Sequence, residues 1–140
     1  VATKPRTLVK EGVLNGYMLS SYSARKLGMQ STGNAGGNHN LIVSHGDLDL
    51  NGLLKVMGTG LLVTELLGHG INMVTGDYSR GAAGFWVENG VIVHPVEEIT
   101  IAGNLQTMLK QIVAVGNDVL VQGSKQVGSI LIENMTVAGD

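Results

Sequence analysis

The 140-residue sequence contains no cysteine, which excludes disulfide bonds, thiolate metal sites and a cysteine nucleophile. It also lacks an uninterrupted apolar run of the roughly 18 residues that a membrane-spanning helix needs. No signal peptide is visible at its N-terminal end. These absences together predict a cytoplasmic protein that does not enter a membrane.

Charge is scarce as well, because Asp, Glu, Lys and Arg make up 14% of the residues and the formal net charge is −2. Nucleic acid is therefore not expected as a partner, since phosphate binding needs a basic surface. What the sequence does contain is 44% hydrophobic residues and 21 glycines. That composition predicts a globular domain, or a piece of one, with many tight turns between short strands.

The most distinctive stretch covers residues 76–86, which hold the only Trp and the only Phe of the chain. It runs into Asn89-Gly90, which lies between two β-branched runs. Asn-Gly in that setting predicts a two-residue type I′ hairpin, because both central residues must adopt φ > 0. Such a hairpin would pair Trp86 with Val93 and Phe85 with His94.

We consider eight consecutive residues of this stretch as candidates for substrate binding. A charged turn comes first, in which Asp77 and Arg80 form an ion pair or Arg80 stays free to hold a carbonyl or carboxylate. Four small residues follow, and they allow another backbone to approach, either a substrate strand or a neighbouring strand of the same sheet. The eight candidates are Asp77, Tyr78, Ser79, Arg80, Gly81, Ala82, Ala83 and Gly84.

Two helices are predicted from apolar residues that recur with helical spacing after a capping residue. One begins after Asp49, ends at Gly58 and carries Leu50, Leu53, Leu54 and Met57. The other begins after Asn104, ends at Gly116 and carries Leu105, Met108, Leu109 and Ile112. A shorter helix is expected at residues 20–27, between a serine cap and Gly28.

The remaining segments predict strands. Residues 8–10 and 13–14 form a hairpin, and further strands are expected at 41–44, 61–66, 71–75, 97–102, 118–121 and 129–137. The chain shows no alternation of strand and helix, so the pairing should be largely antiparallel. The expected fold is a β-dominated α+β domain, with an antiparallel sheet or a barrel-like arrangement and two or three short helices.

Catalytic and metal-binding patterns are missing. His39, His45, His69 and His94 are far apart, and no Gly-x-Ser-x-Gly motif is present. His45-Gly46-Asp47 would place two ligands close together, but a polar turn is the simpler interpretation. The glycine-rich residues 30–40 could cradle an anion or form a surface loop, and they lack the Lys-Ser/Thr of a P-loop. We predict no catalytic residue and no metal ligand in this chain.

Several segments nevertheless resemble the PmbA (TldE) branch of the TldD/PmbA family, and the resemblance extends over essentially the whole chain. They are residues 22–28 (YSARKLG), 31–37 (STGNAGG), 58–61 (GTGL), 64–66 (TEL), 76–90 (GDYSRGAAGFWVENG) and 95–105 (PVEEITIAGNL). Members of this family are about three times as long. The resemblance therefore implies that residues 1–140 are the C-terminal domain of a PmbA-type protein whose N-terminal part is absent.

The resemblance also implies a function. TldD and PmbA proteins assemble into a heteromeric cytoplasmic metalloprotease that cleaves unfolded peptides, such as leader peptides of peptide antibiotics and antitoxins, and carry the older label of modulators of DNA gyrase. In the TldD branch, two histidines of an upstream His-Glu-x-x-x-His helix and a cysteine in the region of residues 125–129 hold zinc. This chain has no cysteine, so that role cannot be transferred to it.

We therefore expect a non-catalytic subunit that shapes the proteolytic cavity and helps to hold an unfolded peptide, with zinc in a TldD-type partner. Two alternatives stay open: a zinc metallopeptidase with its ligands upstream, and a non-enzymatic peptide-binding regulator. The fragment itself is expected to self-associate, because loss of the upstream part would leave strand edges unpaired.

Overall fold

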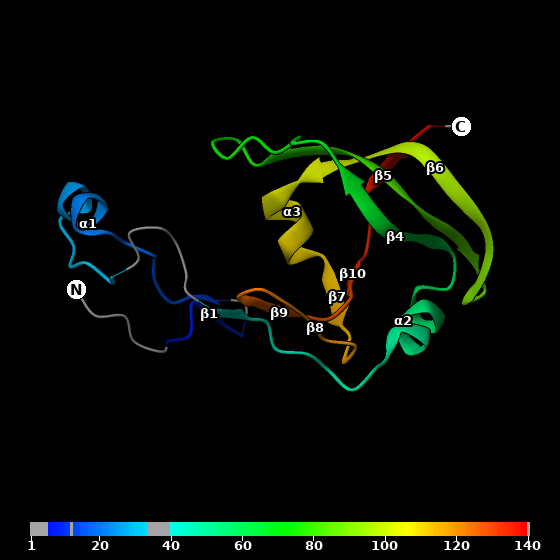
Figure 1. Ribbon diagram of the computed structural model, residues 1–140, viewed down its shortest axis with the longest axis horizontal. Coiled ribbons are helices and arrows are strands. Elements are labelled where there is room, and N and C mark those ends of the chain that lie inside the picture. The colour runs from blue at the N-terminus through cyan, green and yellow to red at the C-terminus, as the bar shows by residue number, and fades with distance from the viewer. Residues whose placement is uncertain (1–5, 12, 34–39, 140) are drawn as a thin grey trace. The chain divides into compact units, whose positions relative to one another are not determined.

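The computed structural model describes residues 6–11, 13–33 and 40–139. They form two compact units, which are treated separately here. One comprises Val1–Ile42 and Val121–Gln126, and the other comprises Val43–Leu120 and Val127–Asp140 (Figure 1). Within the described residues there are eleven strands and three helices, and the strands are mostly antiparallel. The predicted β-dominated fold is confirmed, and its sheets are open, not closed into a barrel.

The smaller unit begins with the predicted hairpin, in which β1 (Val9–Lys10) pairs with β2 (Val13–Leu14). Helix α1 (Ser21–Leu27) follows, and the Ser20 hydroxyl accepts a hydrogen bond from the Ser23 backbone N–H. Gly28 ends α1 in the left-handed conformation, as a C-terminal glycine commonly does. The sequence signals at both ends of this helix are therefore confirmed.

A three-stranded sheet has the order β3-β9-β8, with β3 (Leu41–Ile42) parallel to β9 (Lys125–Val127) and β8 (Leu120–Gln122) at its other side. The expected strand at 41–44 is thus shorter than predicted. Residues 34–39, most of the predicted glycine-rich loop, lie outside the described residues.

The larger unit is built on a four-stranded antiparallel sheet of order β11-β6-β5-β4. Its strands are β4 (Gly60–Leu67), β5 (Asp77–Glu88), β6 (Val91–Asn104) and β11 (Thr136–Ala138). A second, two-stranded sheet pairs β7 (Ile112–Val115) with β10 (Ile130–Ile132). Helices α2 (Leu50–Met57) and α3 (Leu105–Lys110) complete the unit.

Helix α2 follows the sequence prediction closely. The Asp49 carboxylate accepts a hydrogen bond from the Gly52 backbone N–H, with a nitrogen-to-oxygen distance of 2.8 Å. Leu53 and Leu54 are buried on the apolar side of the helix, and Gly58 ends it. The local cap and the apolar spacing thus sufficed to place this element.

The β5–β6 hairpin turns at Asn89 and Gly90, whose φ angles of 51° and 75° are those of the predicted type I′ turn. The predicted register is wrong beyond the second pair, however. A bulge after Trp86 pairs Trp86 with His94, where Val93 was expected, and Phe85 with Pro95, where His94 was expected. One extra residue on β6 causes this shift.

Three other segments depart from the prediction. Helix α3 stops at Lys110, because the β-branched residues that follow pair with β10 as strand β7. The segment 71–75 is a turn, since the Asn72 side chain accepts hydrogen bonds from two following backbone N–H groups. The run 129–137 is divided into β10 and β11.

Candidate functional site

All eight candidate residues lie in the first two thirds of β5, the second-longest strand of the sheet. Successive side chains of a strand point to opposite faces, so the candidates divide into two groups. Ala82 is 1% exposed and forms an apolar cluster with Ile99 and Ile101, against which Tyr78 packs. Tyr78, Arg80, Ala82 and Gly84 therefore belong to the face that carries this cluster, which we call the cluster face.

The predicted ion pair between Asp77 and Arg80 does not form. Residues three apart in a strand lie on opposite faces, so the two charges cannot meet. The Asp77 carboxylate instead accepts hydrogen bonds from the Thr75 hydroxyl at 3.1 Å and from the Asn104 amide at 3.5 Å. Arg80 remains unpaired among the described residues, as the alternative interpretation proposed.

The side chains of the four residues 81–84 are small for different structural reasons. A Cβ atom on Gly84 would lie 1.8 Å from the Leu62 carbonyl oxygen, so this glycine lets β4 approach β5. A Cβ atom on Gly81 would meet nothing closer than Leu67 Cβ at 3.4 Å. For Gly84 and for the buried Ala82, packing within the sheet explains the small side chain. Gly81 and Ala83 lie on the opposite face and are half-buried.

Ala83 lies at an irregularity in both neighbouring strands. On β4, Val63 pairs with Gly84 and Glu65 with Ala83, which leaves one extra residue between them. On β6, Val96 pairs with Gly84 and Ile99 with Ala82, which leaves two residues opposite Ala83. Both flanking strands are therefore bulged at the level of Ala83, and such bulges bend a strand and increase its twist.

Strand β4 forms one edge of the four-stranded sheet among the described residues. Its last four residues, from Thr64 to Leu67, are exposed, and Leu66 and Leu67 are 39% and 55% accessible. An edge strand presents backbone N–H and C=O groups that an extended chain can pair with. The free side of β4 is therefore available to another backbone, as is that of β11, the strand at the other edge.

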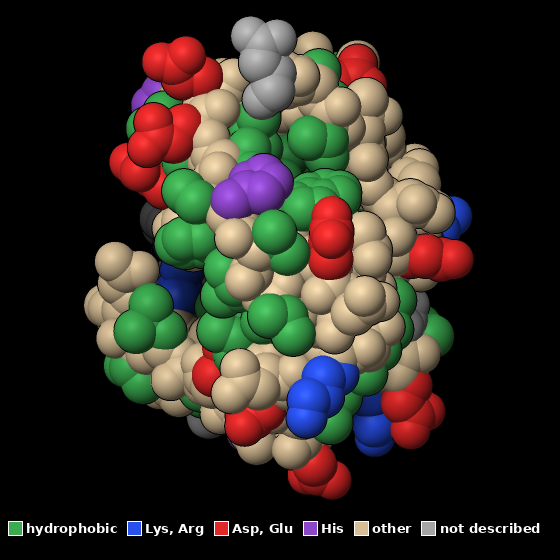
Figure 2. Space-filling view, turned by 90° about the vertical axis from the view of Figure 1, so that its right-hand side faces the viewer, with side chains coloured by type: hydrophobic (Ala, Val, Ile, Leu, Met, Phe, Trp, Pro, Cys, Tyr) green, Lys and Arg blue, Asp and Glu red, His purple; other side chains and the backbone are tan. Residues whose placement is uncertain are grey.

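Apolar side chains are also exposed elsewhere on the unit. Met73 and Val74, in the turn before β5, are 83% and 95% accessible, and Val91 and Val93 on β6 are more than half accessible. Figure 2 shows one side of the molecule, where hydrophobic side chains lie at the surface between separate acidic and basic groups.

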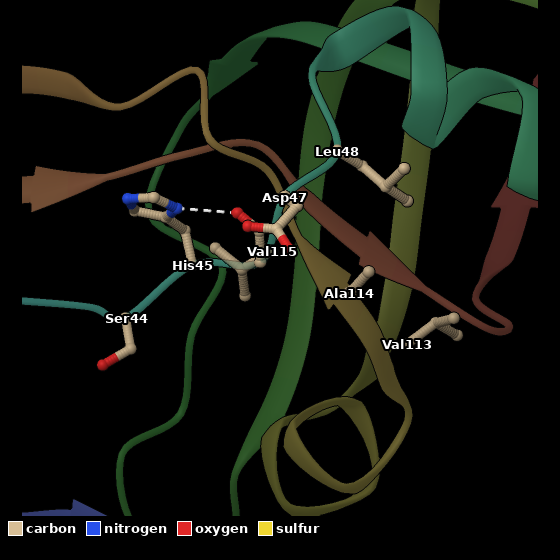
Figure 3. A pocket seen from close by; sticks show the side chains of 8 residues that line it. Ser44, His45, Asp47, Leu48, Val113, Ala114 and Val115 are labelled. Carbon is tan, nitrogen blue, oxygen red and sulfur yellow. Dashed lines mark hydrogen bonds between the residues drawn. The ribbon is translucent and has the colours of Figure 1, made fainter.

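A shallow pocket of about 470 Å³ lies beside β7 in the larger unit (Figure 3). Its lining residues are Ser44, His45, Gly46, Asp47, Leu48, Val113, Ala114 and Val115. The His45 Nδ1–H donates to the Gly46 carbonyl, with a nitrogen-to-oxygen distance of 2.7 Å. Within the described parts of the chain, no three His, Cys, Asp or Glu side chains converge to hold a metal, and His39 lies outside them.

One polar contact escaped the sequence analysis. Asp118 accepts two hydrogen bonds from Ser129, from the hydroxyl at 2.5 Å and from the backbone N–H at 3.0 Å. The hydroxyl bond is the main reason why the pKa of Asp118 lies below its ordinary value. Gly116 and Gly128 are pressed together here, since a Cβ on Gly128 would lie 2.0 Å from the Gly116 carbonyl oxygen. The sequence spacing of Asp118 and Ser129 gives no signal that their side chains form a hydrogen bond.

Ser129 belongs to the region in which the TldD branch is expected to carry a zinc-binding cysteine. In this chain the Ser129 hydroxyl is engaged in an internal hydrogen bond with the Asp118 carboxylate. The helices of the described residues are all too short to cross a bilayer.

Comparisons with known proteins agree with the resemblance found in the sequence. The profile of the PmbA/TldA metallopeptidase C-terminal domain matches residues 1–139. Metalloprotease PmbA of Escherichia coli O157:H7 is 56% identical over 139 residues, which cover 99% of this chain and 31% of that protein. A Metalloprotease TldD homolog of Buchnera aphidicola subsp. Acyrthosiphon pisum is 25% identical over 122 residues, which cover 79% of this chain and 25% of that protein.

The fold is also shared with a solved structure. The crystal structure of a candidate modulator of a DNA gyrase from Thermotoga maritima matches with a TM-score of 0.90 and 41% identity. The match covers 99% of this chain and 34% of that one, so the chain spans about a third of the proteins that it matches. The chain therefore belongs to the PmbA/TldD family of metallopeptidases, in which it corresponds to the C-terminal domain of PmbA.

Proposed function

We propose that this domain belongs to a non-catalytic, PmbA-type subunit that shapes the cavity of a TldD/PmbA metalloprotease and holds unfolded peptides there. The zinc that cleaves the peptide would be supplied by a TldD-type partner subunit in the cytoplasm. The names of the relatives support a role in proteolysis for the family as a whole. The domain's own part rests on the structure of its sheet.

The observation that carries the proposal is the edge strand β4. Its last four residues are exposed and, among the described residues, it pairs on one side alone, with β5. A peptide that adds to such an edge is recognised through its main chain, with side chains contributing selectivity. Recognition of this kind suits an enzyme whose substrates share an unfolded backbone and little else.

The residues of β5 next to this edge have complementary features. On the face away from the apolar cluster, Gly81 and Ala83 have small side chains, so little projects from β5 there. Gly84 has no side chain that would push β4 away from β5. An extended chain beside β4 would direct alternate side chains towards each face of the sheet. We assign peptide contact to the outer face at Gly81 and Ala83, and a supporting role to Gly84.

Hydrogen–deuterium exchange on the full-length protein assembled with a TldD-type partner tests this proposal. An unfolded peptide should slow exchange of the amides of β4, because main-chain pairing protects them, and should leave those of α2 unchanged. A peptide that is cleaved while exchange in β4 stays as fast as before would contradict the proposal.

The division of labour between the subunits needs a separate measurement. The full-length protein alone should cleave no peptide, whereas the mixture with the TldD-type partner should, and a chelator should abolish that activity. Cleavage by the protein alone, together with one zinc per chain, would favour the alternative of an independent zinc peptidase. Tight peptide binding with no cleavage in either state would favour a regulator.

A further inference from the structure

Arg80 is a cation on an apolar surface. It occupies the cluster face of β5 between Tyr78 and Ala82, and it pairs across the sheet with Ile101, a buried residue of the apolar cluster. The side chain is partly buried. An arginine at such a position is unusual, because apolar surroundings do not replace the hydration of its charge.

The guanidinium group makes no compensating contact at the one nitrogen atom that is buried without a partner. Its Nε is buried and has no hydrogen-bond partner, and no other buried side-chain nitrogen or oxygen of the described residues is in that state. No described carboxylate forms an ion pair with it. Arginine does not lose its proton in proteins, so the charge persists. A partner from outside the described residues would remove this cost.

The chain that follows β4 stays beside β5 but carries few side chains next to Arg80. Strand β4 ends at Leu67, which is level with Gly81, so Arg80 lies one residue beyond its end. The next residues are Gly68, His69 and Gly70, and the Gly70 backbone packs directly against the Ser79 carbonyl. The Ser79 backbone N–H donates to the Gly70 carbonyl at 2.7 Å, and Ile71 then pairs with Tyr78. His69 is exposed, and a Cβ atom on Gly68 would have no other atom within 4 Å, so the space beside Gly68 is open.

We propose that Arg80 binds a carboxylate of the peptide that lies along β4. The planar guanidinium matches a carboxylate through two parallel hydrogen bonds, and a carbonyl or hydroxyl would not neutralise its charge. The inference rests on the proposed function, because the bound peptide supplies the carboxylate. Two sources share this chemistry: the C-terminal α-carboxylate of the peptide and an Asp or Glu side chain within it.

The experiment uses the full-length protein assembled with its TldD-type partner under chelation, so that peptides bind without being cleaved. Fluorescent unfolded peptides are compared in pairs: a free C-terminus against a C-terminal amide, and an internal Glu against Gln. The variants are Arg80→Gln and Arg80→Lys, with Lys110→Gln as the control that removes one exposed positive charge from the end of α3.

Arg80→Gln should weaken binding of the carboxylate-bearing peptide about tenfold to a hundredfold, the range of a lost charge-assisted hydrogen bond. Binding of the matching neutral peptide, with a C-terminal amide or with Gln, should not change. A loss in the first pair of peptides identifies the C-terminal carboxylate as the group that Arg80 binds, and a loss in the second pair identifies the Glu side chain. Arg80→Lys should restore part of the affinity, because it keeps the charge without the planar geometry. Lys110→Gln should bind like wild type.

Three results would overturn the inference. Arg80→Gln could weaken charged and neutral peptides equally, could leave both unchanged, or could lower the melting temperature by several degrees because a protein carboxylate is its true partner. If a neutral peptide still protects β4 in these cases, the proposed function stands and the role of Arg80 alone is refuted. If no peptide protects β4, the proposed function itself is refuted.

Discussion

Gly84→Ala tests whether the small residues of β5 are set by packing within the sheet. The added Cβ would lie 1.8 Å from the Leu62 carbonyl oxygen and 2.9 Å from the Leu62 carbonyl carbon. Both are backbone atoms of β4, so no side-chain rotation can relieve the clash. A comfortable carbon-to-oxygen contact is about 3.3 Å, so β4 would have to retreat by about 1.5 Å at this point.

The energetic cost follows from two terms. Forcing a methyl group into a packed interior costs about 1–3 kcal/mol, and a disrupted backbone hydrogen bond between β4 and β5 adds about 1 kcal/mol. Replacing glycine restricts the unfolded chain and returns about 0.4–1 kcal/mol. The net loss in the free energy of unfolding is therefore about 1–3.5 kcal/mol, or roughly 5–15 °C in melting temperature for a domain of this size.

Gly81→Ala is the matched control, because the nearest atom to its added Cβ is Leu67 Cβ at 3.4 Å. Its unfolding free energy should stay within about 1 kcal/mol of wild type, since an ordinary contact is gained and unfolded-state entropy is reduced. Urea denaturation of the three proteins measures the difference. Equal stability of the two variants would refute the reasoning, because their chemistry is identical and only the surroundings differ.

Four further predictions follow from the same structure. Ala83→Leu should block peptide cleavage by the assembled protease with only a small fall in melting temperature, since Ala83 is on the outer face; full activity, or a large fall, would contradict this. Ser129→Ala should raise the pKa of Asp118 towards its ordinary value, as carboxyl NMR titration would show. Because that pKa is lowered in the folded state, the stability advantage of wild type over this variant should be present at neutral pH and shrink as acidification passes through the lowered pKa; a pH-independent difference would rule out the hydrogen bond as its source. Elemental analysis of the dialysed domain should find less than one zinc per chain, and a stoichiometric amount of zinc would refute the non-catalytic assignment. Light scattering of the isolated domain should show association at high concentration, because β4 and apolar side chains are uncovered, and a monodisperse monomer would argue against it.

The elements predicted well from the sequence are those that local chemistry determines. Asp49 and Gly58 mark the two ends of α2, and Asn89-Gly90 specifies the turn of the long hairpin. The register could not be predicted, because no sequence signal marks Val93 as the extra residue that forms the bulge opposite Trp86 and Val87. Ile112 could not be assigned from the sequence either. Its spacing from Leu105 and Met108 fits a helix, but in the structure it belongs to strand β7 and pairs with β10.

The eight candidate residues show how far sequence analysis reached at the proposed site. The sequence analysis treated Asp77 and Arg80 as parts of a charged turn, whereas in the structure both belong to strand β5, whose alternation puts them on opposite faces. Arg80 and Asp77 therefore looked like partners when they are not. The contact between Asp118 and Ser129 joins loops that are eleven residues apart, and no local rule predicts it.

The paired bulges at Ala83 have a consequence for comparing relatives. Val63 and Leu66 on β4 pair with residues of the same face of β5, although they are three positions apart, and Val96 and Ile99 on β6 do the same. A single-residue deletion at Thr64 would remove the bulge on β4 and leave every pair between β4 and β5 in place. Deletion of Leu62, in contrast, would move Leu61 and Gly60 to the opposite faces of the sheet. Single-residue deletions in the family should therefore be tolerated better at Thr64, which is exposed, than at the residues of β4 that precede it.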